Sequence, residues 1–230
     1  MKRFWKVAQA VAEQEGWGVR LDDKPLRTPG RALLAVPTEA LGEAIAREWA
    51  TAEGTIEPWA MPLTGLANAA IDRIEPDRDA FATSLGTYAE GDLACYRAEW
   101  PQTLAARQLE SWDALLGWAR RRYDVDFVTT TGIVHVAQPR ATVERLAHAV
   151  AELDPVHLAG LSPLVTIGGS LVAALAVLED ALTPEQAWDA VSIDERWQIE
   201  KWGADAEAET AMASRRRDFF AAARFLDLLE

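Results

Sequence analysis

The chain has 230 residues, of which 50% are hydrophobic and 26% charged, and its formal net charge is −13. This composition supports one large or two small folded cores and excludes a globally disordered protein. The acidic excess argues against nucleic acid and membrane surfaces as partners, because phosphate backbones and anionic lipids carry the same sign of charge, and it favours a partner with a basic patch.

The first forty residues predict a small antiparallel sheet. Trp17, Val19 and Leu21 alternate with small or polar residues, which is the period of a half-buried strand. Turn-forming residues follow at 22–25, and a further apolar run ends at Pro37. Short strands separated by tight turns are typical of antiparallel pairing.

Helices are expected to dominate from Thr38 onward. Thr38 suits the N-cap position, and the helix behind it carries Leu41, Ile45 and Trp49 on one face. Further helices are expected to begin near prolines 62, 76, 101 and 139. Two segments, 93–97 and 125–138, are predicted to be extended, the second because apolar and polar residues alternate along it. The predicted fold class is therefore α+β, with a small N-terminal antiparallel β domain over residues 1–50 and a larger, mostly α-helical domain over 51–230.

One uncharged stretch, residues 158–178, is long enough to span a bilayer. Pro163 and the Gly168-Gly169 pair interrupt it, however, and its flanks are acidic rather than basic. We therefore predict a buried helix over 156–181 and no membrane insertion. A membrane-anchored factor is the alternative for this segment.

The segment 184–202 predicts one continuous helix. Residues 183–186 read Thr-Pro-Glu-Gln, a capping box with proline at the first helical position, and Gly203 suits the helix end. An apolar stripe runs along this predicted helix, with Glu195 at its centre. The stripe consists of Trp188, Val191, Ile199 and Trp202. Ile193 and Trp197 are expected on the opposite side.

A carboxylate on an apolar face costs free energy unless it has a partner. Either an arginine inside the fold neutralises Glu195, or the face is open and Glu195 meets an incoming chain. Both possibilities stay open from the sequence. Since tryptophan is enriched at protein interfaces, this segment is the best candidate contact surface of the chain.

Catalytic and metal-binding patterns are missing from the sequence. The three histidines lack metal-ligand spacing, and neither a nucleophile elbow nor a phosphate-binding loop is present. The single cysteine, Cys95, can form no internal disulfide, and no apolar signal segment follows the first residues. A bacterial cytoplasmic location is therefore expected, with a mature organellar protein as the alternative. We predict no enzymatic activity and no cofactor. The alternative is an enzymatic or small-molecule-binding protein with an acidic pocket built from Asp22, Asp92 or Glu195.

Short motifs in a defined order along the chain resemble the assembly chaperone family that handles the alpha subunit of the ATP synthase catalytic head. These motifs are Arg3-Phe4-Trp5, Leu21–Pro29, Val36-Pro37-Thr38, Glu48-Trp49, Met61–Thr64, Asp92-Leu93, Cys95-Tyr96-Arg97, Trp112-Asp113 and Gln198–Gly203. The resemblance implies a non-enzymatic chaperone that binds unassembled alpha subunit and shields its beta-facing surface until the head forms. An orphan subunit exposes a large apolar interface, which is an aggregation hazard.

The resemblance also implies which residues contact the client. It points to Trp49 and to the acidic stretch before the Lys-Trp-Gly motif, which in this chain is Asp194-Glu195, interrupted by Arg196. Trp49 has a second interpretation as a core anchor between the two domains, because it completes the apolar face of its helix. The full predicted client-binding set is Trp49, Trp188, Asp194, Glu195, Glu200, Lys201 and Trp202.

Overall fold

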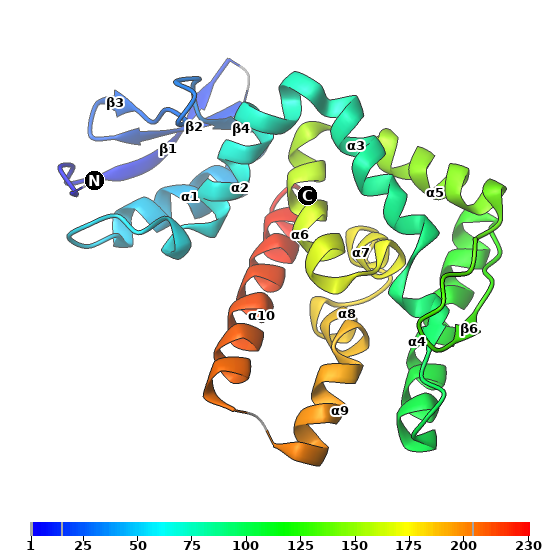
Figure 1. The fold of residues 1–230 in the computed structure, drawn as a ribbon. Coiled ribbons are helices and arrows are strands. Elements are labelled where there is room, and N and C mark those ends of the chain that lie inside the picture. Colours follow the sequence, from blue (N-terminus) through cyan, green and yellow to red (C-terminus); the bar gives the residue numbers. More distant parts are fainter. Residues whose placement is uncertain (1, 15, 204) are drawn as a thin grey trace. The chain divides into compact units, whose positions relative to one another are not determined.

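A computed structural model describes residues 2–14, 16–203 and 205–230 and confirms the α+β class (Figure 1). The chain forms two compact units. The first comprises Met1–Arg78, Asp154–Gly160 and Ala221–Glu230, and the second comprises Asp79–Leu153 and Leu161–Phe220. The predicted division into residues 1–50 and 51–230 concerns separate folding domains and stays a prediction.

The first unit contains the predicted antiparallel sheet. Strand β1 (Ala8–Glu13) pairs with β2 (Gly16–Leu21), and β3 (Lys24–Pro25) and β4 (Ala35–Val36) both pair with β2. The turn after β2 places Asp22 at φ 54°, and its carboxylate accepts hydrogen bonds from the backbone N–H groups of Lys6 and Val7 at 3.0 and 2.9 Å. Those two bonds lower the pKa of Asp22.

Helix α1 (Glu39–Thr51) follows the sheet as predicted. Its N-cap Thr38 accepts a hydrogen bond from the backbone of Leu41, and the residues of its predicted face are buried. Next come a 3-10 turn (Pro58–Ala60), α2 (Pro62–Ala69), a π-helical turn (Ala70–Ile74) and a second 3-10 turn (Glu75–Asp77). The carboxylate of Glu48 accepts from the backbone N–H groups of Leu63 and Thr64, so α1 caps the start of α2.

The remaining helices belong to the second unit or run from one unit into the other. They are α3 (Arg78–Gly86), α4 (Gln102–Tyr123), α5 (Arg140–Ala151), α6 (Pro155–Gly168), α7 (Leu171–Leu178), α8 (Pro184–Val191), α9 (Ile193–Trp202) and α10 (Ala206–Asp227). In the second unit, α4 packs against α7, α8 and α9. A 3-10 turn (Thr87–Glu90) and another (Leu93–Cys95) precede α4.

Helix α7 forms the buried centre of the second unit, because residues 171–177 are all buried. The prediction of one helix over 156–181 is wrong, since Gly169 adopts φ +67° and Ser170 becomes the N-cap of α7. Buried Asp92 accepts hydrogen bonds from the Ser170 hydroxyl and the Val172 N–H at 2.8 and 2.9 Å. Across residues 2–14, 16–203 and 205–230, no helix combines the length and apolar character needed to cross a bilayer.

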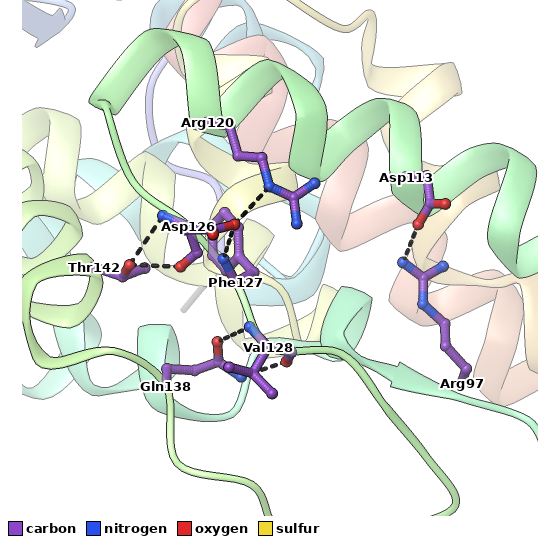
Figure 2. A network of polar contacts seen from close by, with 8 residues as sticks. All are labelled: Arg97, Asp113, Arg120, Asp126, Phe127, Val128, Gln138 and Thr142. Atoms are coloured by element: carbon purple, nitrogen blue, oxygen red, sulfur yellow. Dashed lines mark hydrogen bonds and ion pairs between the residues drawn. The ribbon is translucent and has the colours of Figure 1, made fainter.

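The segment 125–138, predicted to be extended, is a paired strand over only a small part of its length. Among the described residues of this segment, only Thr130–Thr131 (β6) pairs with another strand, the parallel Tyr96–Arg97 (β5). Elsewhere a side chain replaces the partner strand: the Gln138 amide accepts from the Val128 N–H at 3.0 Å and donates to the Val128 carbonyl at 2.9 Å (Figure 2). The alternation of apolar and polar residues therefore indicates an extended backbone, but it does not show whether a neighbouring strand pairs with it.

Candidate client-binding surface

The predicted helix over 184–202 is two helices. The capping box of Thr183 and Gln186 starts α8 as expected, and Gly203, at φ +78°, follows the last residue of α9. The ladder breaks at Ser192, whose hydroxyl donates to the carbonyl of Trp188 at 2.6 Å. A serine hydroxyl that bonds the preceding turn competes with the backbone and bends helices. The projection over one continuous helix is consequently wrong for α9.

The break separates the predicted apolar stripe into a buried and an exposed part. Trp188 and Val191 of α8 are buried, whereas Trp202 is 74% exposed. Trp197, expected on the opposite side, is the buried tryptophan of α9. An apolar residue that is mostly exposed on an ordered helix is available for contact with another molecule.

Glu195 has an arginine partner within its own unit. Its carboxylate lies 3.0 Å from Nη1 of Arg215 on α10, and Arg215 also donates to the carbonyl of Ile167 at 3.0 Å. Glu195 thus has the arginine partner of the first alternative, although the pair lies at the surface rather than inside the fold. The pair is only half-buried, with 41% of the Glu195 side chain exposed, so Glu195 still presents a charge to solvent.

Asp194 faces the inside of the same unit. Its carboxylate accepts a 2.6 Å hydrogen bond from the amide of Gln108, which is 1% exposed. The other side of that amide accepts from the N–H of Ala98 at 2.7 Å. Burial raises the pKa of Asp194, although the Gln108 bond opposes it and Glu195 adds to it. Asp194 therefore holds α9 to α4, through a glutamine that also binds the segment before α4.

Glu200, Lys201 and Trp202 form the outer end of α9. Arg107 of α4 binds both carboxylate oxygens of Glu200, at 2.9 and 2.8 Å, and holds the pKa of Glu200 below its usual range. The ammonium of Lys201 lies 5.9 Å from the Trp197 ring centre, and Trp202 packs edge-on against Trp197 at 5.4 Å. An exposed indole on a helix end that also carries charged side chains suits recognition of a protein surface.

Trp188 and Trp49, the two remaining predicted residues, are 5% and 7% exposed. Trp188 packs against Phe219 with ring centres 5.5 Å apart. In the first unit, the Trp49 indole donates to the Thr64 hydroxyl at 3.1 Å, and its carbonyl accepts from the Trp5 indole at 3.0 Å. Both side chains are buried in a core. Each can therefore influence a client only indirectly, by supporting the surface residues that pack on it.

The carboxylates proposed for an acidic pocket all have structural partners. Asp22 binds the backbone before β1, Asp92 caps α7 and Glu195 pairs with Arg215. Burial raises the pKa of Asp92, against the hydrogen bonds that its backbone neighbours donate. Among the described residues, no group of three or more His, Cys, Asp or Glu side chains could hold a metal ion.

Two apolar residues of the 125–138 segment are largely exposed, which the alternation of apolar and polar residues did not indicate. Ile133 is 98% exposed and Val134 74% exposed. Gly132, at φ +81°, donates to the Arg97 carbonyl at 2.8 Å and anchors the turn before them. The Thr131-Gly132 pair was the available signal, since glycine with positive φ favours a turn over a continuing strand.

Comparison with known proteins agrees with this architecture. The sequence model of the ATP12 chaperone protein family matches residues 2–120. The chain belongs to the ATP12 chaperone family. The crystal structure of Atp12 from Paracoccus denitrificans is 42% identical, with a TM-score of 0.94, and the match covers 100% of this chain and 98% of that one. The Atu1473 protein of Agrobacterium tumefaciens is 36% identical, also with a TM-score of 0.94, and the match covers 100% of this chain and 86% of that one.

A curated relative extends the comparison to mitochondria. The mitochondrial protein atp12 of Schizosaccharomyces pombe is 24% identical over 219 residues, which cover 90% of this chain and 75% of the relative. Family membership confirms the expected class, a chaperone of ATP synthase assembly. The family match ends at residue 120, so Trp49 lies inside it and all candidate residues of α8 and α9 lie beyond it.

Proposed function

We propose that this ATP12-family chaperone binds the unassembled alpha subunit of the ATP synthase and shields its beta-facing surface until the catalytic head forms. The observation that carries the proposal is membership of the family, supported by a structural match over the whole chain. In this proposal the chain catalyses no reaction, needs no cofactor and acts in the bacterial cytoplasm.

The contact surface proposed for the client is the exposed face of α9. Glu195, Glu200, Lys201 and Trp202 supply the direct contacts, since each is at least partly exposed. Asp194, Trp188 and Trp49 support that function from inside the fold. A tryptophan anchor with charged neighbours offers the client apolar burial together with polar contacts that fix orientation.

The charge of Glu195 is tested by two variants. We expect Glu195→Lys to reduce capture of isolated alpha subunit, but that change also sets a second cation against Arg215 and can disturb the fold. The double variant Glu195→Lys with Arg215→Glu restores an ion pair of reversed direction. The double variant loses the Arg215 hydrogen bond to Ile167, so capture is compared at a temperature where thermal melts show both proteins to be folded. If the charge facing the client matters, the double variant then captures less alpha subunit than the parent. Full capture by the double variant would assign Glu195 a purely internal role.

The exposed indole is tested with a matched control. Trp202→Ala is expected to weaken suppression of alpha-subunit aggregation, measured by light scattering, because a tryptophan anchor commonly contributes about 2 kcal/mol or more. Trp100→Ala removes an indole that is 75% exposed, against 74% for Trp202, and should leave suppression unchanged. Equal loss in both variants, or in neither, would contradict the assignment of the contact to α9.

The client itself is tested with isolated subunits. Parent protein is expected to keep alpha subunit in solution and to leave aggregation of isolated beta subunit unchanged. Failure to bind alpha subunit, or equal protection of both subunits, would refute the proposed client while leaving the family membership intact.

A further inference from the structure

The first unit contains an open groove of about 740 Å³ beside strand β4. Its apolar lining includes Leu33, Ala35, Ile71 and Val156. Leu33 is 37% exposed, and Ile71 and Val156 are half-buried. A concave surface with partly exposed aliphatic side chains can bury one or two apolar side chains of a ligand.

The charged residues of the groove all have the same sign. Glu13, Glu75 and Asp154 line it, and the described residues of its lining include no lysine, arginine or histidine. Two of these carboxylates have a basic partner that does not itself line the groove. Arg20 lies 3.2 Å from Glu13, and Nδ1 of His157 lies 2.8 Å from Asp154. Even if Arg20 is counted against Glu13 and His157 against Asp154, Glu75 leaves the groove with an excess of negative charge. Such a potential attracts a cationic ligand and repels an anionic one.

The strand beside the groove has a free edge. β4 pairs with β2 on one side, and in the part of the chain that the structure describes no strand pairs with its other side. An open edge offers backbone hydrogen bonds to an extended segment, whose alternate side chains then point into neighbouring pockets. Ala70 and Ile71 of the lining belong to the π-helical turn Ala70–Ile74, a rare backbone form often found at functional sites.

We propose that this groove binds an extended peptide segment in which apolar side chains alternate with lysine or arginine. The apolar side chains contact Leu33, Ile71 and Val156, and the basic ones face Glu75 and Asp154. The inference goes beyond the proposed function, because it concerns a surface of the first unit and does not depend on which subunit is the client. An acidic peptide or nucleic acid is excluded by the sign of the lining charges.

Binding is tested with the full chain and a capped, fluorescein-labelled heptapeptide in which arginine and leucine alternate. Fluorescence anisotropy is measured at low ionic strength. We expect saturable binding, and affinities at least about tenfold weaker for two control peptides, one with glutamate in place of arginine and one with serine in place of leucine. Equal binding of the serine peptide would show attraction by charge alone and would overturn the proposal.

The place of binding is tested by substitutions in the groove. Glu75→Arg, which reverses a charge of the groove, and Leu33→Ser, which removes an apolar contact without adding charge, are each expected to weaken binding of the arginine-leucine peptide about tenfold. Glu43→Arg makes the same change of net charge at an exposed position of α1 that does not line the groove, and it should bind like the parent. Thermal melts confirm that the variants fold. Unchanged binding by Glu75→Arg, or an equal loss in Glu43→Arg, would place the peptide elsewhere and overturn the proposal.

Discussion

Two carboxylates of α9 have acidities shifted in opposite directions by their surroundings. Asp194 is half-buried, and burial raises its pKa from the ordinary value of 3.8. Glu200 is exposed, and its hydrogen bond with Arg107 lowers its pKa from the ordinary value of 4.5. In the sequence, both residues are acidic positions on one predicted helix. Their pKa values shift in opposite directions because their surroundings in the folded protein differ.

The raised pKa of Asp194 makes a prediction about stability and pH. The folded protein holds this proton at a pH where the unfolded chain has released it, so the contribution of Asp194 to stability falls as pH rises through the window above 3.8. Asp194→Asn keeps the hydrogen bond acceptor for Gln108 and removes the titration. Urea unfolding between about pH 3.5 and pH 7, in about half-unit steps, should show that the variant gains stability relative to the parent as pH rises.

Glu200→Gln is the matched control. The pKa of Glu200 is lowered where that of Asp194 is raised, so its contribution to stability changes with pH in the opposite direction. A lowered folded pKa contributes stability that is present above the ordinary value of 4.5 and is lost as pH falls through the folded value. The parent should therefore gain stability relative to Glu200→Gln as pH rises. Parallel curves for the parent and Asp194→Asn, or the same trend in both variants, would contradict the environments assigned to the two carboxylates.

Close approaches between helices decide where glycine is required. A Cβ atom built on Gly160 of α6 would lie 2.6 Å from Cδ2 and 2.7 Å from Cγ of Leu226 on α10, inside the core of the first unit. A Cβ atom on Gly65 of α2 would meet nothing within 4 Å. The two glycines look alike in the sequence, since each lies within a predicted helix.

These distances predict opposite effects of the same substitution. Gly160→Ala should lower the free energy of unfolding by about 1–3 kcal/mol, because it overpacks a filled core. Gly65→Ala should raise it by up to about 1 kcal/mol, since alanine favours an unobstructed helix. Urea denaturation measures both. A neutral Gly160→Ala variant would show that Leu226 can move aside without cost.

Polar side chains decide where elements are interrupted. Ser192 divides α8 from α9 by bonding to Trp188, and Ser170 starts α7 with the help of Asp92. In the 125–138 segment, Gln138 occupies the place of a partner strand (Figure 2). Periodicity of apolar residues predicts helix or extended chain, but it contains no information on these single polar contacts.

The net charge of −13 belongs to the whole molecule and predicts how it meets its client. If alpha subunit presents a basic patch to the chaperone, electrostatic attraction speeds the encounter and salt screens it. We expect the association rate with alpha subunit to fall at least several-fold between about 50 mM and about 500 mM salt, with a much smaller change in the dissociation rate. Biolayer interferometry measures both rates. An association rate independent of salt would show that net charge does not guide the encounter.

Domain organisation also belongs to this scale. The predicted boundary at residue 50 lies between groups that bond to each other, since Trp49 contacts Thr64 and Glu48 caps the start of α2. The first unit gathers three separate segments of the chain. Because these segments are far apart in the chain, no single change of composition or linker in the sequence marks where the unit begins and ends.

Sequence patterns were enough to establish the α+β class, the N-terminal sheet, most helix starts and the family, because these depend on local periodicity, capping residues and ordered motifs. Packing in three dimensions was needed to establish which tryptophan of α9 is buried, which arginine meets Glu195, and that Ile133 stands in solvent. Each of these depends on one hydrogen bond or on a neighbour distant in the chain. The interruption at Ser192 lies outside α9, and no pattern within α9 indicates it.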